Sequence, residues 1–208
     1  MNTSDRQAHW EHVYATKSEG EVSWFQDNPT ISLQLIAATG AGLGSAIIDV
    51  GGGASRLVDA LVAGGHQAVT VLDLSDAALA TAKARLGSGA QTVTWIAADV
   101  TTWNPTEQYD VWHDRAAFHF LTDRGDRDAY VARLTKALRW GEQAIIGTFS
   151  LQGPERCSGL SVVRYDARSL GEILGPAFQL LETRDEEHRT PWGSSQHFQF
   201  SRFGFAGC

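Results

Sequence analysis

The sequence predicts a single α/β domain built on a doubly wound sheet of seven mostly parallel strands. Short runs rich in valine and isoleucine alternate with stretches of helical periodicity, which is typical of repeated β-α units. A glycine-rich turn follows the first of these runs. The last two strand-like segments have no helix between them, which indicates a C-terminal antiparallel hairpin.

The seven expected strands are short, mostly apolar segments bounded by glycine or polar residues. They are residues 46–50, 68–74, 92–97, 109–113, 143–149, 178–183 and 197–205. Helices are expected after the glycine turn, over 76–86 behind the N-cap residue Ser75, near 129–138 and around 171–174. We therefore expect a Rossmann-like core over residues 46–208. Residues 1–45 are expected to form an N-terminal helical lid, with a helix beginning near Pro29.

Composition narrows the possible partners and location. The chain has 208 residues, 43% of them hydrophobic, which is enough for one full core without disulfides. Its net charge of -7 argues against nucleic acid and anionic membranes as partners. The two cysteines, Cys157 and Cys208, show neither disulfide nor metal-ligand spacing, so we expect a cytoplasmic protein without a metal site. No apolar run is long enough to cross a bilayer.

The residues best suited to bind a ligand follow the predicted strands. The first strand runs into the turn Asp49-Val50-Gly51-Gly52-Gly53-Ala54-Ser55, whose glycines allow close approach of the backbone to a ligand. Asp73 ends the second strand, where its carboxylate can accept both hydroxyls of a ribose. Asp99 follows the third strand, where it can receive the amino group of an adenine. Because ligands of parallel sheets bind at the carboxyl ends of the strands, these groups are expected to converge.

Two features separate an adenosyl sulfonium ligand from a dinucleotide. The dinucleotide motif G-x-G-x-x-G requires a third glycine where this chain has Arg56. Asp49 beside the turn attracts an ammonium or sulfonium group and repels a diphosphate. The sequence therefore favours S-adenosylmethionine over NAD.

The segments DVGGGAS, VLDLS and AADV resemble the first motifs of class I S-adenosylmethionine-dependent methyltransferases. Within that class, Asp114-Arg115-Ala116-Ala117 is similar to the fourth-strand segment of the thiopurine-type group. The resemblance implies that Asp114 and Arg115 lie beneath the reacting methyl group. It also implies an aromatic lid that faces the sulfonium. The cofactor-binding residues that it implies are Trp24, Asp49, Gly51, Gly53, Ser55, Asp73, Leu74, Asp99 and Val100.

Methyl transfer is an in-line displacement in which positioning supplies much of the catalysis. A general base is needed only where the acceptor must lose a proton. His119 is the first candidate for that role, and His113 and Asp114 are the next candidates. A buried histidine that packs between Phe118 and Phe120 explains His119 equally well. These aromatic residues also depart from the thiopurine-type pattern, so a thiopurine acceptor is not predicted.

Three functions remain open at this point. The first is methyl transfer to a small-molecule acceptor. The second is protein-lysine methylation, ranked lower because the fourth-strand signature D-K-G-T is not found in the chain. The third is a non-catalytic module that binds S-adenosylmethionine and regulates a partner.

Overall fold

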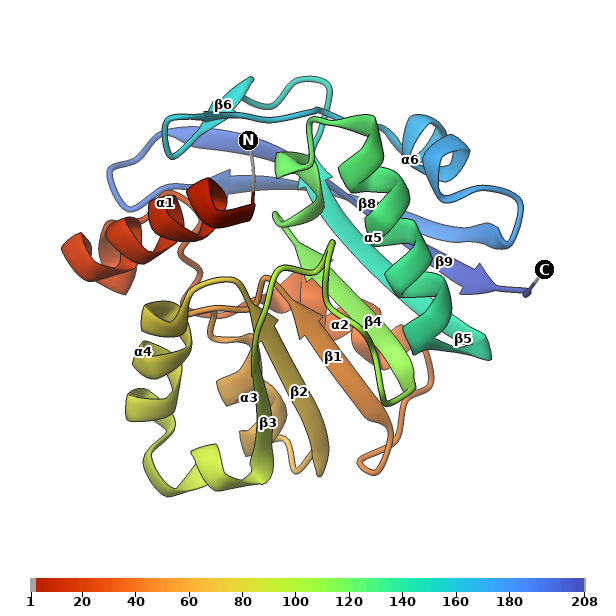
Figure 1. Ribbon diagram of the computed structural model, residues 1–208, viewed down its shortest axis with the longest axis horizontal. Coiled ribbons are helices and arrows are strands. Elements are labelled where there is room, and N and C mark those ends of the chain that lie inside the picture. The colour runs from red at the N-terminus through yellow and green to blue at the C-terminus, as the bar shows by residue number, and fades with distance from the viewer. Residues whose placement is uncertain (1–2, 208) are drawn as a thin grey trace.

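Seven strands form one twisted sheet in the order β3-β2-β1-β4-β5-β9-β8 (Figure 1). The structure is a computed structural model and describes residues 3–207, so Cys208 lies outside the described residues. The first five strands in this order are parallel, and β9 pairs antiparallel with both β5 and β8. The predicted fold class, including its C-terminal hairpin, is confirmed.

The strands of the sheet agree closely with the expected segments at the start of the chain. Their bounds are β1 Ala46–Val50, β2 Ala68–Asp73, β3 Val93–Ala97, β4 Tyr109–Arg115, β5 Leu138–Phe149, β8 Phe178–Arg189 and β9 Ser195–Phe205. The α-helices are α1 Thr3–Thr16, α2 Thr30–Ala38, α3 Leu57–Ala63, α4 Asp76–Leu86, α5 Arg124–Ala137 and α6 Ala167–Leu174. Three 3-10 helices span Glu19–Glu21, Gly87–Thr92 and Phe118–Phe120.

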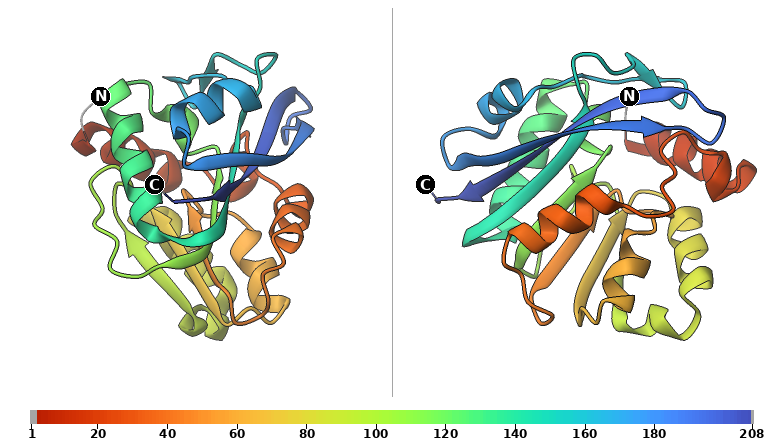
Figure 2. Two further views of the ribbon diagram at one scale, coloured as in Figure 1. Left: turned by 90° about the vertical axis from the view of Figure 1, so that its right-hand side faces the viewer. Right: turned by 180° about the vertical axis from the view of Figure 1, so that it is seen from behind.

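Helices cover both faces of the sheet, with α2 and α3 on one side and α5 and α6 on the other (Figures 1 and 2). Alternate residues of each central strand therefore enter different cores. In β1, Ile47 packs in the cluster that contains Leu35 of α2 and Leu61 of α3, whereas Ile48 packs in the cluster that contains Tyr130 of α5. Burial on both faces explains why these strands are continuous apolar runs in the sequence.

The strand order reverses between β1 and β4, which leaves a crevice at their carboxyl ends. Helix α1 lies across this end of the sheet, above the start of α4 (Figure 1). No helix in the described part of the chain is both long and apolar enough to cross a membrane.

The structure differs from the expected elements in three places. Helix α5 ends at Ala137 and β5 begins at the next residue, so residues 138–142 are strand, not helix end and loop. The terminal hairpin is longer than expected, because β8 continues through polar residues to Arg189. As the edge strand, β8 is largely exposed and carries no apolar signal there. The loop after β5 also contains a small hairpin, β6 Arg156–Cys157 and β7 Leu160–Ser161.

Candidate functional site

Two adjoining cavities lie at the carboxyl ends of β1, β2 and β4, and both reach Gly51, Arg115, Tyr14 and Trp24. Most of the residues predicted to bind a cofactor line one or both cavities. These are Trp24, Asp49, Gly51, Ser55, Asp73, Leu74, Asp99 and Val100. The chain thus brings side chains from three strand ends and from the N-terminal segment to one place.

The glycine turn after β1 is tightly packed on both sides. Gly51 has a φ of +70°, and a Cβ there would lie 2.5 Å from the Cβ of Ala117. Gly53 has a φ of +38°, and its Cβ would lie 2.7 Å from Oδ2 of Asp73. Gly53 does not line either cavity among the described residues, but it lets the Asp73 carboxylate approach the turn. Only glycine combines these backbone angles with this spacing.

Asp49 presents one bonded and one free carboxylate oxygen. Its Oδ1 lies 2.7 Å from Nδ1 of His113, whose Nε2 lies 2.9 Å from the hydroxyl of Ser32. Its Oδ2 is buried and has no hydrogen-bond partner among the described residues. A buried carboxylate oxygen without a partner is costly, so this position favours a ligand that brings a cationic donor.

Asp73 is also buried, at the end of β2. Burial, together with the nearby carboxylate of Asp49, raises the pKa of Asp73 to about 7, although the N–H of Ser75 donates to its Oδ1 at 2.8 Å. Ser75 in turn caps α4, since its hydroxyl accepts the N–H of Ala78 at 3.1 Å. The Asp73 carboxylate therefore has a fixed position beside the cavity and retains capacity to accept hydrogen bonds.

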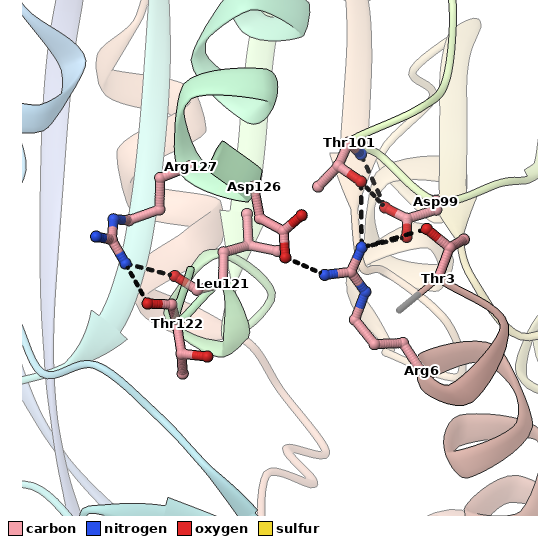
Figure 3. Close-up of polar contacts among 8 residues, drawn as sticks. All are labelled: Thr3, Arg6, Asp99, Thr101, Leu121, Thr122, Asp126 and Arg127. Carbon is pink, nitrogen blue, oxygen red and sulfur yellow. Dashed lines mark hydrogen bonds and ion pairs between the residues drawn. The ribbon is translucent and has the colours of Figure 1, made fainter. Parts of the chain in front are cut away.

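Asp99 lines the larger cavity, and Figure 3 shows its polar contacts. The backbone N–H and the hydroxyl of Thr101 donate to its Oδ1 at 2.8 and 2.7 Å, and Arg6 donates to its Oδ2 at 2.7 Å. Burial alone would raise the pKa of Asp99, but the bonds from Thr101 and Arg6 hold it below its usual value. Sequence reasoning did not find Arg6, because nothing in the pattern around residue 6 links it to a residue 93 positions away.

Arg115 stands where the two cavities adjoin. Its Nη1 donates to the backbone oxygen of Trp24 at 2.9 Å, and its guanidinium lies 4.6 Å from the ring centroid of Phe198. Its Nη2 lies 3.6 Å from Oε2 of Glu186, which balances its charge. Burial lowers the pKa of Arg115. Arg115 thus fixes the Trp24 segment against the end of β4 and lines both cavities, and its place beneath the reacting methyl group stays a prediction.

Aromatic side chains form the wall opposite the strand ends. The ring of Trp10 lies 5.6 Å from that of Trp24 and 5.0 Å from that of Phe120, and Tyr14 lies 6.3 Å from Trp24. All four side chains line the larger cavity. Such a wall provides cation–π attraction for a sulfonium.

The structure places Asp114 beneath the turn that follows β4, not against the cavity. Its carboxylate accepts the N–H groups of Ala117 and Phe118 at 3.0 and 3.2 Å and the hydroxyl of Tyr130 at 2.8 Å. Burial raises the pKa of Asp114 to about 6 despite these bonds. Asp114 therefore holds the shape of the turn and lines neither cavity, which argues against the catalytic role that the resemblance implies for it.

The structure does not bring His119 to either cavity. Its side chain is fully buried, and its Nδ1 accepts the backbone N–H of Phe149 at 3.1 Å. Burial and the charge of Arg115 lower the pKa of His119 to about 3. An enclosed imidazole that lines neither cavity is not placed to take a proton from an acceptor bound there. His119 is therefore a packing residue, the alternative that its aromatic neighbours suggested.

Comparison with known proteins identifies a domain within this chain and structures of similar fold. Residues 47–141 match a family model described as a methyltransferase domain, and no curated protein matches the sequence. A similar solved structure is a SAM-dependent methyltransferase from Anabaena variabilis, with a TM-score of 0.77 and 12% identity, over 99% of this chain and 96% of that one.

Two further solved structures contain the product of the cofactor. The N-methyltransferase NodS from Bradyrhizobium japonicum, in complex with S-adenosylhomocysteine, has a TM-score of 0.71 and 18% identity over 99% of both chains. The 1,6-didemethyltoxoflavin-N1-methyltransferase from Burkholderia thailandensis has a TM-score of 0.70 and 20% identity, over 98% of this chain and 86% of that one.

The domain match identifies residues 47–141 as a methyltransferase domain, and the fold of the chain is that of the similar methyltransferases. NodS, which shares this fold, binds S-adenosylhomocysteine, the demethylated form of S-adenosylmethionine. The free oxygen of Asp49 and the glycine turn that a Cβ would fill both suit this cofactor. These matches do not point to the thiopurine-type group within the class.

Proposed function

We propose that the chain transfers the methyl group of S-adenosylmethionine to a small-molecule acceptor, with Asp49, Asp73 and Asp99 holding the cofactor. The observation that carries this proposal is the convergence of three buried carboxylates, from three successive strand ends, around one glycine turn. Burying three carboxylates together is unfavourable in the free protein. It is favourable where a bound ligand supplies a positive charge and several donors.

Each carboxylate has a distinct part in this proposal. The free Oδ2 of Asp49 receives the ammonium group of the methionine moiety. Asp73, beside Leu74 in the larger cavity, accepts the two ribose hydroxyls. Asp99 accepts the amino group of adenine, since a carboxylate oxygen can take a second hydrogen bond beside the one from Arg6.

The chemistry follows from positioning. When bound, the cofactor supplies a methyl group activated by the positive sulfur. The aromatic wall and Arg115 orient the acceptor and exclude water, which favours in-line attack. Neither His119 nor Asp114 is placed to remove a proton from the acceptor. We propose an acceptor that attacks through a lone pair already available, which requires neither residue as a base.

Enclosure of the cavity favours a small acceptor over a protein side chain. Helix α1 covers the carboxyl ends of the strands, and Trp10 and Tyr14 of this helix line the larger cavity (Figure 1). The similar methyltransferase from Burkholderia thailandensis holds bound 1,6-didemethyltoxoflavin, which is a small molecule. Both observations support the small-molecule proposal.

The proposal is tested by incubating the purified chain with methyl-labelled S-adenosylmethionine and fractionated cell extract. Asp73→Asn serves as the control for label that does not depend on the site. Label in small-molecule fractions supports the proposal, whereas label on polypeptide supports protein methylation instead. If no fraction carries label although the chain binds S-adenosylhomocysteine, the result supports the third function, a non-catalytic binding module.

A further inference from the structure

Arg6 joins the lid to two carboxylates that lie far apart in the sequence (Figure 3). Its Nη2 donates to Oδ2 of Asp99 at 2.7 Å and to the hydroxyl of Thr101 at 3.2 Å. Its Nη1 pairs with Oδ2 of Asp126, in the first turn of α5. The Arg6–Asp99 pair is shielded from water and only weakly screened by salt, because these side chains are 10% and 5% exposed, whereas Asp126 is 29% exposed.

Polar contacts hold α1 at two points besides its aromatic contacts. Among its fourteen residues, only Arg6 and Val13 are buried. At the other end of the helix, the carboxylate of Glu11 accepts the N–H groups of Asp76 and Ala77, at the start of α4. Helix α1 therefore spans the cavity as a strap, held to α5 by Arg6 and to α4 by Glu11. Trp10 and Tyr14 of α1 also pack against Trp24 and Phe120, so the closed position of the helix depends on these aromatic contacts together with the polar ones.

We propose that Arg6 is a positioning residue that latches α1 over the adenine end of the cavity by bridging Asp99 and Asp126. The inference rests on the proposed role of Asp99 as the acceptor for the adenine amino group. The latch keeps the bound nucleoside enclosed while the methyl group is transferred. Breaking the bridge frees α1 and lets the spent cofactor leave.

The charge of the Asp99–Arg6–Asp126 bridge is also compatible with binding of the adenine amino group. One guanidinium between Asp99 and Asp126 leaves a net negative charge, so Asp99 can still accept the adenine amino group. Because Arg6 holds Asp99 from the lid side, closure of α1 and recognition of adenine act on the same carboxylate. Loss of the bridge is therefore expected to act mainly on the rate at which the nucleoside leaves.

Two variants of the full chain separate the latch from direct contact with the nucleoside. Arg6→Met removes the guanidinium and keeps much of the length of the side chain. Asp126→Asn removes a carboxylate that does not line the cavity. Asp128→Asn is the matched control, since Asp128 lies in the same helix and forms an exposed pair with Arg124. All three are compared with wild type for the dissociation rate of S-adenosylhomocysteine, and for hydrogen exchange of residues 3–16 without ligand.

We expect dissociation to be faster by about tenfold or more in Arg6→Met and by a smaller factor in Asp126→Asn. Exchange in α1 should rise in both variants, while exchange in β1, β2 and β4 stays unchanged. The Asp128→Asn control should match wild type in both measurements. If the protein instead unfolds in Arg6→Met, the Asp126→Asn comparison decides alone.

Unchanged dissociation and unchanged α1 exchange in both variants would overturn the latch and leave the proposed function standing. Slower dissociation in Arg6→Met would also overturn it, because Arg6 would then compete with adenine for Asp99. Failure of wild type to bind S-adenosylhomocysteine would overturn the proposed function and the latch together.

Discussion

Ionisation of Asp73 should control how tightly the cofactor binds between pH 6 and 8. Burial raises the pKa of Asp73 to about 7 in the free protein, with a further increase from Asp49. Ribose hydroxyls donate to the ionised carboxylate, so the protonated form must lose its proton before the ligand binds. Affinity should therefore rise with pH, and the dissociation constant at pH 6 should exceed that at pH 8 by about tenfold.

Calorimetric titration with S-adenosylhomocysteine at pH 6, 7 and 8 measures this effect. The Asp73→Asn variant should bind more weakly at pH 8 by on the order of 2 kcal/mol, since two charge-assisted bonds are lost. Its affinity should also change less with pH than that of wild type. The amino group of the ligand also titrates, but it contributes equally to the pH dependence of wild type and of the variant. The difference between the two proteins therefore reports on Asp73. An equal pH dependence in wild type and variant would refute the assignment of Asp73 to the ribose.

Three further variants test the turn and the residues beneath it. Gly51→Ala should abolish binding of S-adenosylhomocysteine and lower stability by about 1–3 kcal/mol, because the new Cβ meets Ala117 at a φ of +70°; normal affinity by calorimetry would argue against this. Asp114→Asn should lower the free energy of unfolding in urea by about 2 kcal/mol, with Asp128→Asn as an unaffected control; equal midpoints would show that the bonds under the turn matter little. His119→Ala should cost about 2–4 kcal/mol of stability while cofactor affinity stays unchanged. Because His119 has a lowered pKa of about 3 in the fold, wild type should lose stability as pH falls below about 6.5, and the variant should lose less.

The placement of the three carboxylates proposed to hold the cofactor could be predicted because each lies at or just after the carboxyl end of a strand. In a parallel sheet, residues at successive carboxyl ends meet at one edge, so linear spacing is enough to group Asp49, Asp73 and Asp99. The strands themselves were readable because burial on both faces makes them continuous apolar runs. The turn after β1 could be predicted from its consecutive glycines. The structure gives the reason for two of them, because close contacts leave no room for a side chain at Gly51 or Gly53.

Other features depend on contacts that no local pattern reveals. Arg6 reaches Asp99 and Asp126 across 93 and 120 positions of sequence, and α1 itself shows only weak apolar periodicity. His119 resembles a catalytic base by residue type alone, but packing against Phe149 encloses it. The outer half of β8 is polar because it forms the exposed edge of the sheet, so its length could not be read from hydrophobicity.

Calorimetric titration of the purified chain with S-adenosylhomocysteine, and separately with NAD, tests the central claim most directly. Three carboxylates beside a glycine turn should bind one nucleoside with an ammonium group at micromolar-scale concentrations, and should repel a diphosphate. We predict measurable heat for S-adenosylhomocysteine and none of comparable affinity for NAD. Tighter binding of NAD would contradict the account.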